Sequence, residues 1–295
     1  MKNTVFTGAA TAIITPMNEK GVDFDAFERL IEWQIKEGID AIVVAGTTGE
    51  GSTLSDAEHK QVIKFCVDKV AKRVPVIAGT GSNDIAYAVE LTKYACEAGA
   101  DAVLVVTPYY NKATQKGLIA SFTAIADAST KPCILYNVPS RTGCNITPET
   151  CAVLSKHPNI VAVKEASGNI SQIAKVAQLC GDDLDIYSGN DDQIIPVLSL
   201  GGKGVISVLS NLLPKETSQM CHSFMEGDTE TARNLQLKYL SLVDALFCEV
   251  NPIPAKAAMS AMGYCDNYLR LPLTTMEKPN EDKLLAIMKD CGIEF

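Results

Sequence analysis

One lysine and one tyrosine stand where two buried strands are expected to end. Lys164 follows the apolar run 160–163, and Tyr136 lies near the end of the run 133–137. A lysine shielded from water gives up its proton more readily, and its free amine can form a Schiff base with a carbonyl substrate. A neighbouring phenol can carry protons to and from the adduct. The alternatives are that Lys164 pairs with an acid at the rim, and that Tyr136 is a core tyrosine bonded to a carbonyl.

A glycine-flanked turn and an arginine provide groups that suit a carboxylate. The turn at 46–50 reads GTTGE, and the amides and hydroxyls of Thr47 and Thr48 can bind an anion. Arg141 follows the rigid Pro139 and can clamp a carboxylate through two parallel hydrogen bonds. A tight loop with helix-capping threonines and a lone surface arginine are the alternative interpretation. The sequence offers no carboxylate pair or metal-ligand cluster beside these residues, so we expect neither a metal nor a cofactor.

Eight short apolar runs alternate with helical stretches and place these residues. The runs span 10–14, 41–45, 75–79, 102–107, 133–137, 160–165, 185–188 and 204–208. Near-continuous apolar character is typical of parallel strands that are covered on both faces. Strict alternation through eight units predicts a (β/α)8 barrel, in which active sites lie at the C-terminal ends of the strands.

The helical stretches suggest how the chain is organised beyond the strands. They span 24–36, 55–72, 84–97, 115–128, 147–156, 169–180 and 191–200, and after the last strand 214–226, 229–249, 252–262 and about 281–289. We therefore expect a catalytic barrel over residues 1–225 and a helical region over 226–295 that packs on it. Five aspartates near the seventh strand are expected to be solvated: Asp182, Asp183, Asp185, Asp191 and Asp192.

Charge and cysteine usage exclude several classes of function. The chain has 26 Lys and Arg against 35 Asp and Glu, a net charge of −9, which disfavours nucleic acid and anionic membranes as partners. Its ten cysteines contain no CxxC pair, and most lie in apolar stretches, so we expect buried, reduced thiols. The N-terminal segment lacks a basic start followed by a long apolar core. We therefore expect no signal peptide and a cytoplasmic location.

Three motifs in order carry a family resemblance that covers essentially the whole chain. GTTGE at 46–50, YNVPSRTG at 136–143 and VKEA at 163–166 resemble the pyruvate-dependent class I aldolases typified by N-acetylneuraminate lyase. The most similar branch is the dihydrodipicolinate synthase family. This resemblance implies a cofactor-free lyase that condenses pyruvate with L-aspartate 4-semialdehyde through a lysine Schiff base, in diaminopimelate and lysine biosynthesis.

Other activities remain open beside this one. The runner-up is a 2-keto-3-deoxy sugar acid aldolase or N-acetylneuraminate lyase, but such lyases typically lack Arg141 and often carry serine in place of Thr47. A relative that only binds a keto acid is expected to have lost Lys164, Tyr136 or Thr47, and all three are present. A phosphosugar isomerase needs a carboxylate base and a phosphate loop, and the sequence indicates neither.

The resemblance also implies a role for each site residue. Lys164 forms the Schiff base; Tyr136, Thr47 and Tyr110 relay protons; Thr48 with Thr47 holds the pyruvate carboxylate; Arg141 binds the semialdehyde carboxylate; Gly189 and Ile206 supply backbone near the lysine. Tyr110 is expected to reach into the neighbouring subunit's site, within a homotetramer built from tight dimers.

Many members of the family are inhibited by lysine bound at a dimer interface near the GTTGE turn. Aligned by motif, the matching positions are Gly51, Asp56, His59, Asn83, Tyr87 and Tyr109. Gly51, Asp56 and Tyr87 replace the serine, histidine and glutamate of the lysine-sensitive pattern. Because a phenol replaces a carboxylate poorly beside an ammonium group, we expect weak or absent inhibition.

Overall fold

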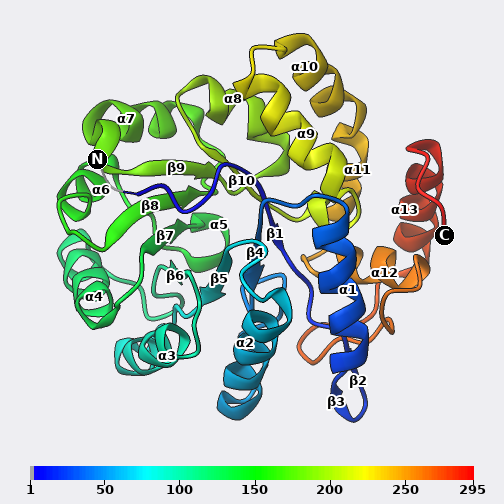
Figure 1. The fold of residues 1–295 in the computed structure, drawn as a ribbon, viewed down its shortest axis with the longest axis horizontal. Helices are drawn as coiled ribbons and strands as arrows, with labels where there is room; N and C mark the ends of the chain where they lie inside the picture. Colours follow the sequence, from blue (N-terminus) through cyan, green and yellow to red (C-terminus); the bar gives the residue numbers. More distant parts are fainter. Residues whose placement is uncertain (1–2) are drawn as a thin grey trace.

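Eight parallel strands close into a barrel in the computed structural model, which describes residues 3–295 (Figure 1). Their order is β1-β10-β9-β8-β7-β6-β5-β4, and β4 pairs back with β1. The strands are β1 (Gly8–Ala12), β4 (Ala41–Val44), β5 (Val76–Gly79), β6 (Ala102–Val106), β7 (Cys133–Asn137), β8 (Ile160–Glu165), β9 (Asp185–Ser188) and β10 (Gly204–Ser207). The predicted (β/α)8 barrel is confirmed, although its first strand begins at Gly8 and ends at Ala12, earlier than expected.

Helices follow the strands and surround the barrel (Figure 1). They are α1 (Phe24–Lys36), α2 (Asp56–Val70), α3 (Ile85–Glu97), α4 (Gln115–Ala128), α6 (Pro148–Leu154), α7 (Ile170–Cys180) and α8 (Ile194–Ser199). The prediction missed the hairpin of β2 (Met17–Asn18) and β3 (Gly21–Val22), and also the one-turn helix α5 (Pro139–Thr142) after β7. These pieces are too short to produce a periodic pattern.

The C-terminal part of the chain is helical, as predicted, but it is divided differently. It contains α9 (Pro214–Met225), α10 (Thr229–Lys238), α11 (Leu240–Leu246), α12 (Ile253–Ala261) and α13 (Lys278–Asp290). The single helix expected over 229–249 is wrong, because Tyr239 leaves helical geometry with φ −98° and ψ 5° and separates α10 from α11. Tyr239 is buried in the apolar core at this break.

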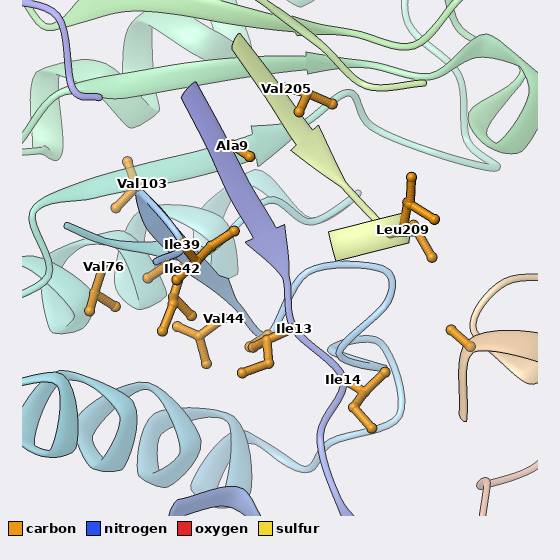
Figure 2. Packing of buried hydrophobic residues seen from close by; sticks show 14 of the residues in the cluster. Ala9, Ile13, Ile14, Ile39, Ile42, Val44, Val76, Val103, Val205 and Leu209 are labelled. Atoms are coloured by element: carbon orange, nitrogen blue, oxygen red, sulfur yellow. The ribbon is translucent and has the colours of Figure 1, made fainter. Parts of the chain in front are cut away.

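Alternate residues of each strand enter two different cores. Ala10 and Ile206 belong to the core inside the barrel. Ala9 and Val205 belong to the outer core, which packs under the helices (Figure 2). Tyr136 belongs to the inner set. The period of two residues therefore determines which strand-end side chains point into the barrel mouth.

Buried thiols were expected, and seven of the ten cysteines are buried. Burial raises the pKa of the Cys133 thiol to about 12, which keeps it protonated and unreactive. Cys248 is exposed, and Cys265 and Cys291 are half-buried. No helix within residues 3–295 is long and apolar enough to cross a membrane.

The C-terminal region is attached to the GTTGE turn by buried charges. Lys256 of α12 forms an ion pair with Glu50, and both side chains are almost inaccessible to water. Glu50 also accepts a hydrogen bond from the backbone amide of Arg270 (3.3 Å), and the Arg270 guanidinium donates to Glu58 at 2.5 and 2.8 Å. This last pairing lowers the pKa of Glu58 to about 2.

Removing one partner of the buried pair should be strongly destabilising. Lys256→Met leaves Glu50 charged and unpaired, and should lower the free energy of unfolding by about 3–5 kcal/mol in urea titrations. The double variant Lys256→Met/Glu50→Gln should lose much less than the sum of the two single losses. Lys278→Met, which breaks an exposed pair with Asp282, is the control and should cost less than about 1 kcal/mol. Equal losses for Lys256→Met and Lys278→Met would contradict this account.

Candidate active site

Lys164 and Tyr136 are neighbours across the pairing of β7 with β8. The register places the two residues opposite each other, and both side chains are buried. Lys164 Nζ lies 4.4 Å from the centre of the Tyr136 ring, within the range of a cation–π contact. The amine and the phenol therefore share one wall of the barrel mouth.

Gly189, which follows β9, leaves room for the lysine side chain. A Cβ atom at this position would lie 2.6 Å from Ala166 Cβ and 3.1 Å from Lys164 Cε. Its amide donates to the Glu165 carbonyl at 2.8 Å, which ties the end of β9 to the end of β8. The other residue predicted to lie near the lysine, Ile206, is fully buried in the inner core of the barrel.

Asp191 is not solvated, which corrects the prediction made for it. Its Oδ2 accepts hydrogen bonds from the amides of Val208 (3.0 Å) and Leu209 (2.9 Å). Burial raises the pKa of Asp191, whereas hydrogen bonds from Ser207 and these two amides, and the charge of Lys164, act in the opposite direction. A buried carboxylate thus lies within electrostatic range of the lysine. Its position just after a strand end was the signal that could have indicated this.

The GTTGE turn folds tightly against the end of β4. Both Ala45 and Glu50 have φ of 54°, and the Gly51 amide donates to the Gly46 carbonyl at 3.1 Å. A Cβ atom at Gly51 would lie 2.3 Å from the Ala45 carbonyl oxygen, so this position requires glycine. The turn leaves Thr47 exposed.

Thr48 and Arg141 both contact Asn251, a residue that sequence reasoning did not identify. Arg141 lies in α5, and its Nη2 donates to the Asn251 carbonyl at 3.1 Å. Thr48 is buried, and its Oγ1 lies 3.0 Å from the Asn251 side-chain nitrogen. Asn251 is far from both partners along the chain, so no local pattern could have indicated these contacts.

A polar network outside the barrel supports the segment that carries Arg141. Asn137 and Glu165 follow Tyr136 and Lys164 in their strands and point the opposite way. Asn137 Nδ2 donates to Glu165 at 3.0 and 3.2 Å and to Asn145 at 2.9 Å, and its Oδ1 accepts from the Ile146 amide at 2.9 Å. These bonds connect the strand register to the loop beyond α5.

A cavity of about 590 Å³ opens at the barrel mouth. Thr47, Tyr136 and Arg141 line one part of it, together with Val138 and Thr142. The same cavity is lined by five of the six positions matched to the lysine site: Gly51, Asp56, His59, Tyr87 and Tyr109.

Six of the predicted residues are not among those that line this cavity: Lys164, Thr48, Gly189, Ile206, Asn83 and Tyr110. The first four are buried or tightly packed at the strand ends and the turn, whereas Tyr110 is 90% exposed, with a backbone φ of 69°. Tyr109, by contrast, is half-buried and lines the cavity. The structure therefore does not bring Tyr110 to the site of its own chain.

The second part of the cavity is the part lined by the positions matched to the lysine site. The ionisable side chains there are already paired or neutral. Asp56 lies 2.9 Å from Lys60, which also pairs with Glu90 at 2.8 Å. Burial lowers the pKa of His59, whose Nε2 lies 2.9 Å from the Gly79 carbonyl. Because a carbonyl only accepts, this nitrogen carries the ring hydrogen.

No group of three or more metal-binding side chains occurs in the part of the chain that the structure describes, residues 3–295. The residues placed at the mouth supply an amine, a phenol, hydroxyls and a guanidinium.

Comparison with known proteins agrees with this arrangement. Residues 5–291 match the model of the dihydrodipicolinate synthetase family. The 4-hydroxy-tetrahydrodipicolinate synthase of Clostridium perfringens is 58% identical over 276 residues, 94% of this chain and 95% of that protein. That of Acetivibrio thermocellus is 55% identical over 293 residues, 99% of this chain and 100% of the relative. The crystal structure of the Acinetobacter baumannii dihydrodipicolinate synthase complexed with pyruvate superposes with a TM-score of 0.96 at 44% identity, covering 99% of this chain and 100% of that one. The family resemblance noted in the sequence is confirmed: the chain belongs to the dihydrodipicolinate synthetase family.

Proposed function

We propose that this enzyme condenses pyruvate with L-aspartate 4-semialdehyde to give 4-hydroxy-tetrahydrodipicolinate, in diaminopimelate and lysine biosynthesis. The observation that carries the proposal is the Lys164 amine lying 4.4 Å from the Tyr136 ring, beside a cavity lined by Thr47 and Arg141. The related enzyme that crystallised with pyruvate supports the choice of the first substrate. The reaction uses two small water-soluble substrates and no cofactor, and we place it in the cytoplasm.

The first half of the reaction activates pyruvate. The Lys164 amine attacks the ketone carbon, and the carbinolamine loses water to give an imine. The imine withdraws electrons, so a methyl proton leaves and an enamine forms. Tyr136 is the group placed to carry protons in these steps, and Thr47 lines the same cavity. Thr48 and Thr47 hold the pyruvate carboxylate.

The second half joins the two substrates. The nucleophilic enamine carbon attacks the aldehyde carbon and forms the new carbon–carbon bond, while the aldehyde oxygen takes up a proton. The amino group of the semialdehyde then attacks the regenerated imine carbon, which closes the ring and releases the Lys164 amine. Arg141 binds the semialdehyde carboxylate, and this binding orients the aldehyde toward the enamine.

Turnover with alternative substrates tests this assignment against the sugar-acid lyases. We expect condensation of pyruvate with aspartate semialdehyde to have a kcat/KM far above that for cleavage of N-acetylneuraminate or 2-keto-3-deoxygluconate. The Lys164→Ala variant provides the background rate. More efficient cleavage of either sugar acid would replace the proposed function with the alternative.

Arg141→Ala should separate recognition of the two substrates. Loss of the charge-assisted contact should weaken binding of the semialdehyde by about 2–4 kcal/mol, seen as a large increase in its KM. Imine formation with pyruvate, measured by borohydride trapping, should survive. Arg141→Lys should recover only part of the loss, because an ammonium group cannot form two parallel bonds. An unchanged KM for the semialdehyde would refute the role of Arg141.

We also propose that Tyr110 completes the site of a partner subunit in a tight dimer, and that two dimers form a homotetramer. The 90% exposure of Tyr110 and its left-handed backbone support this, because such a conformation costs about 1–3 kcal/mol and leaves the residue facing solvent in this chain. A symmetric dimer places one donated tyrosine in each site.

Complementation between two inactive chains tests the exchange of Tyr110. After subunit exchange, Lys164→Ala and Tyr110→Phe chains form mixed dimers in which one site has both Lys164 and the donated Tyr110. Activity should return to about a quarter of the wild-type value, since half of the dimers are mixed and one of their two sites is intact. Each variant incubated alone is the control. Absent recovery, with mixed dimers demonstrated by native mass spectrometry, would show that Tyr110 does not act across the dimer.

Lysine should inhibit this enzyme weakly through the second part of the cavity. The carboxylate there, Asp56, is paired with Lys60, and burial together with the Asp56 charge raises the pKa of Tyr87, which keeps the phenol neutral. Neither group can therefore neutralise an added ammonium group well. In steady-state assays Tyr87→Glu should increase sensitivity to lysine, with Tyr87→Gln as the uncharged control. Strong inhibition of the wild type by sub-millimolar lysine would overturn this expectation.

A further inference from the structure

Asn251 connects the two elements that the proposed function assigns to the two substrate carboxylates. It lies between α11 and α12 and is 4% exposed. Its side-chain Nδ2 donates to Thr48 Oγ1 at 3.0 Å, and its backbone carbonyl accepts from Arg141 at 3.1 Å. One residue of the C-terminal region thus contacts both the GTTGE turn and α5.

The direction of the bond to Thr48 has a chemical consequence. A hydroxyl has one hydrogen to donate and can accept at its lone pairs. Because the amide of Asn251 supplies the hydrogen in this bond, Thr48 keeps its own hydrogen for another acceptor. An acceptor with a negative charge, such as a carboxylate, forms the stronger bond with a hydroxyl polarised in this way.

The segment that carries Asn251 is held in place independently of substrate. Lys256, which lies five residues further along the chain in α12, forms the buried ion pair with Glu50, which belongs to the same turn as Thr48. The two connections lie on opposite sides of Gly49, so the turn cannot shift without breaking one of them.

We infer that Asn251 is a positioning residue for pyruvate: it orients the Thr48 hydroxyl so that this group donates to the pyruvate carboxylate. The inference rests on the proposed function. Asn251→Ala removes the donor to Thr48 but keeps the backbone carbonyl that receives Arg141. The defect should therefore concern pyruvate, with the concentration for half-maximal borohydride trapping raised about tenfold. The KM for the semialdehyde should change by less than about twofold. Arg141→Ala should show the opposite pattern, with a raised KM for the semialdehyde and normal trapping of pyruvate.

A double-mutant cycle between Asn251 and Thr48 provides the decisive test. The half-maximal pyruvate concentration for trapping is measured for Asn251→Ala, Thr48→Val and the double variant. If Asn251 acts through the Thr48 hydroxyl, the double variant should match Thr48→Val alone, because no hydroxyl remains to be oriented. The inference would be overturned if the fold-changes of the two single variants in this concentration multiplied in the double variant. It would also be overturned if Asn251→Ala had the same half-maximal pyruvate concentration as the wild type.

Two further variants control for folding and for the direction of the hydrogen bond. Asn159→Ala removes a side-chain amide that donates to the carbonyls of Ala126 (3.0 Å) and Ser129 (2.9 Å) at the other end of the barrel. This variant should lower Tm without changing the pyruvate concentration that gives half-maximal trapping. Asn251→Asp is isosteric, but its carboxylate can only accept and takes the Thr48 hydrogen, so trapping should need more pyruvate than in Asn251→Ala. Equal or better trapping in Asn251→Asp would contradict the inference.

The failure of this inference can be distinguished from failure of the proposed function. If wild-type protein shows no trapping on Lys164 at any pyruvate concentration, the proposed function is wrong. If wild-type protein is trapped on Lys164 but the fold-changes of Asn251→Ala and Thr48→Val multiply in the double variant, only the role of Asn251 is wrong.

Discussion

Lys164 can lie against the Tyr136 ring only while β7 and β8 keep the register in which these residues are paired. Side chains alternate along a strand, so a shift of one residue would turn Lys164 outward and bring Glu165 into the barrel mouth. The hydrogen bonds between Asn137 and Glu165 on the outer face oppose such a shift. The placement of the amine on the inner face therefore depends on a polar network on the outer face.

The C-terminal region supports the site from outside the barrel. The strands supply Lys164 and Tyr136, but the GTTGE turn is stabilised by Lys256 and contacted by Asn251, both from the segment around α12. A buried ion pair is costly unless both charges are present and well placed. This requirement links folding of the C-terminal region to the shape of the turn, and hence to the placement of Thr47 and Thr48.

The parts of this arrangement that were predictable from sequence are those encoded locally. The barrel follows from eight apolar runs, and the proximity of Lys164 to Tyr136 follows from their positions at the ends of successive strands. The contact between Asn251 and Thr48 joins residues 203 positions apart, and no periodicity or motif predicts it. The burial of Asp191 depends on amides of a different strand end, at Val208 and Leu209, and the break at Tyr239 depends on tertiary packing rather than helix propensity.

Lys164 is the amine that we propose forms the covalent bond with pyruvate. The most direct measurement is borohydride reduction in the presence of pyruvate, followed by mass spectrometry of the peptides, with Lys164→Ala as the control. We expect a reduced pyruvate adduct on Lys164 alone, and no adduct in the variant. An adduct on a different lysine, or fully active protein that carries no adduct after reduction, would contradict it.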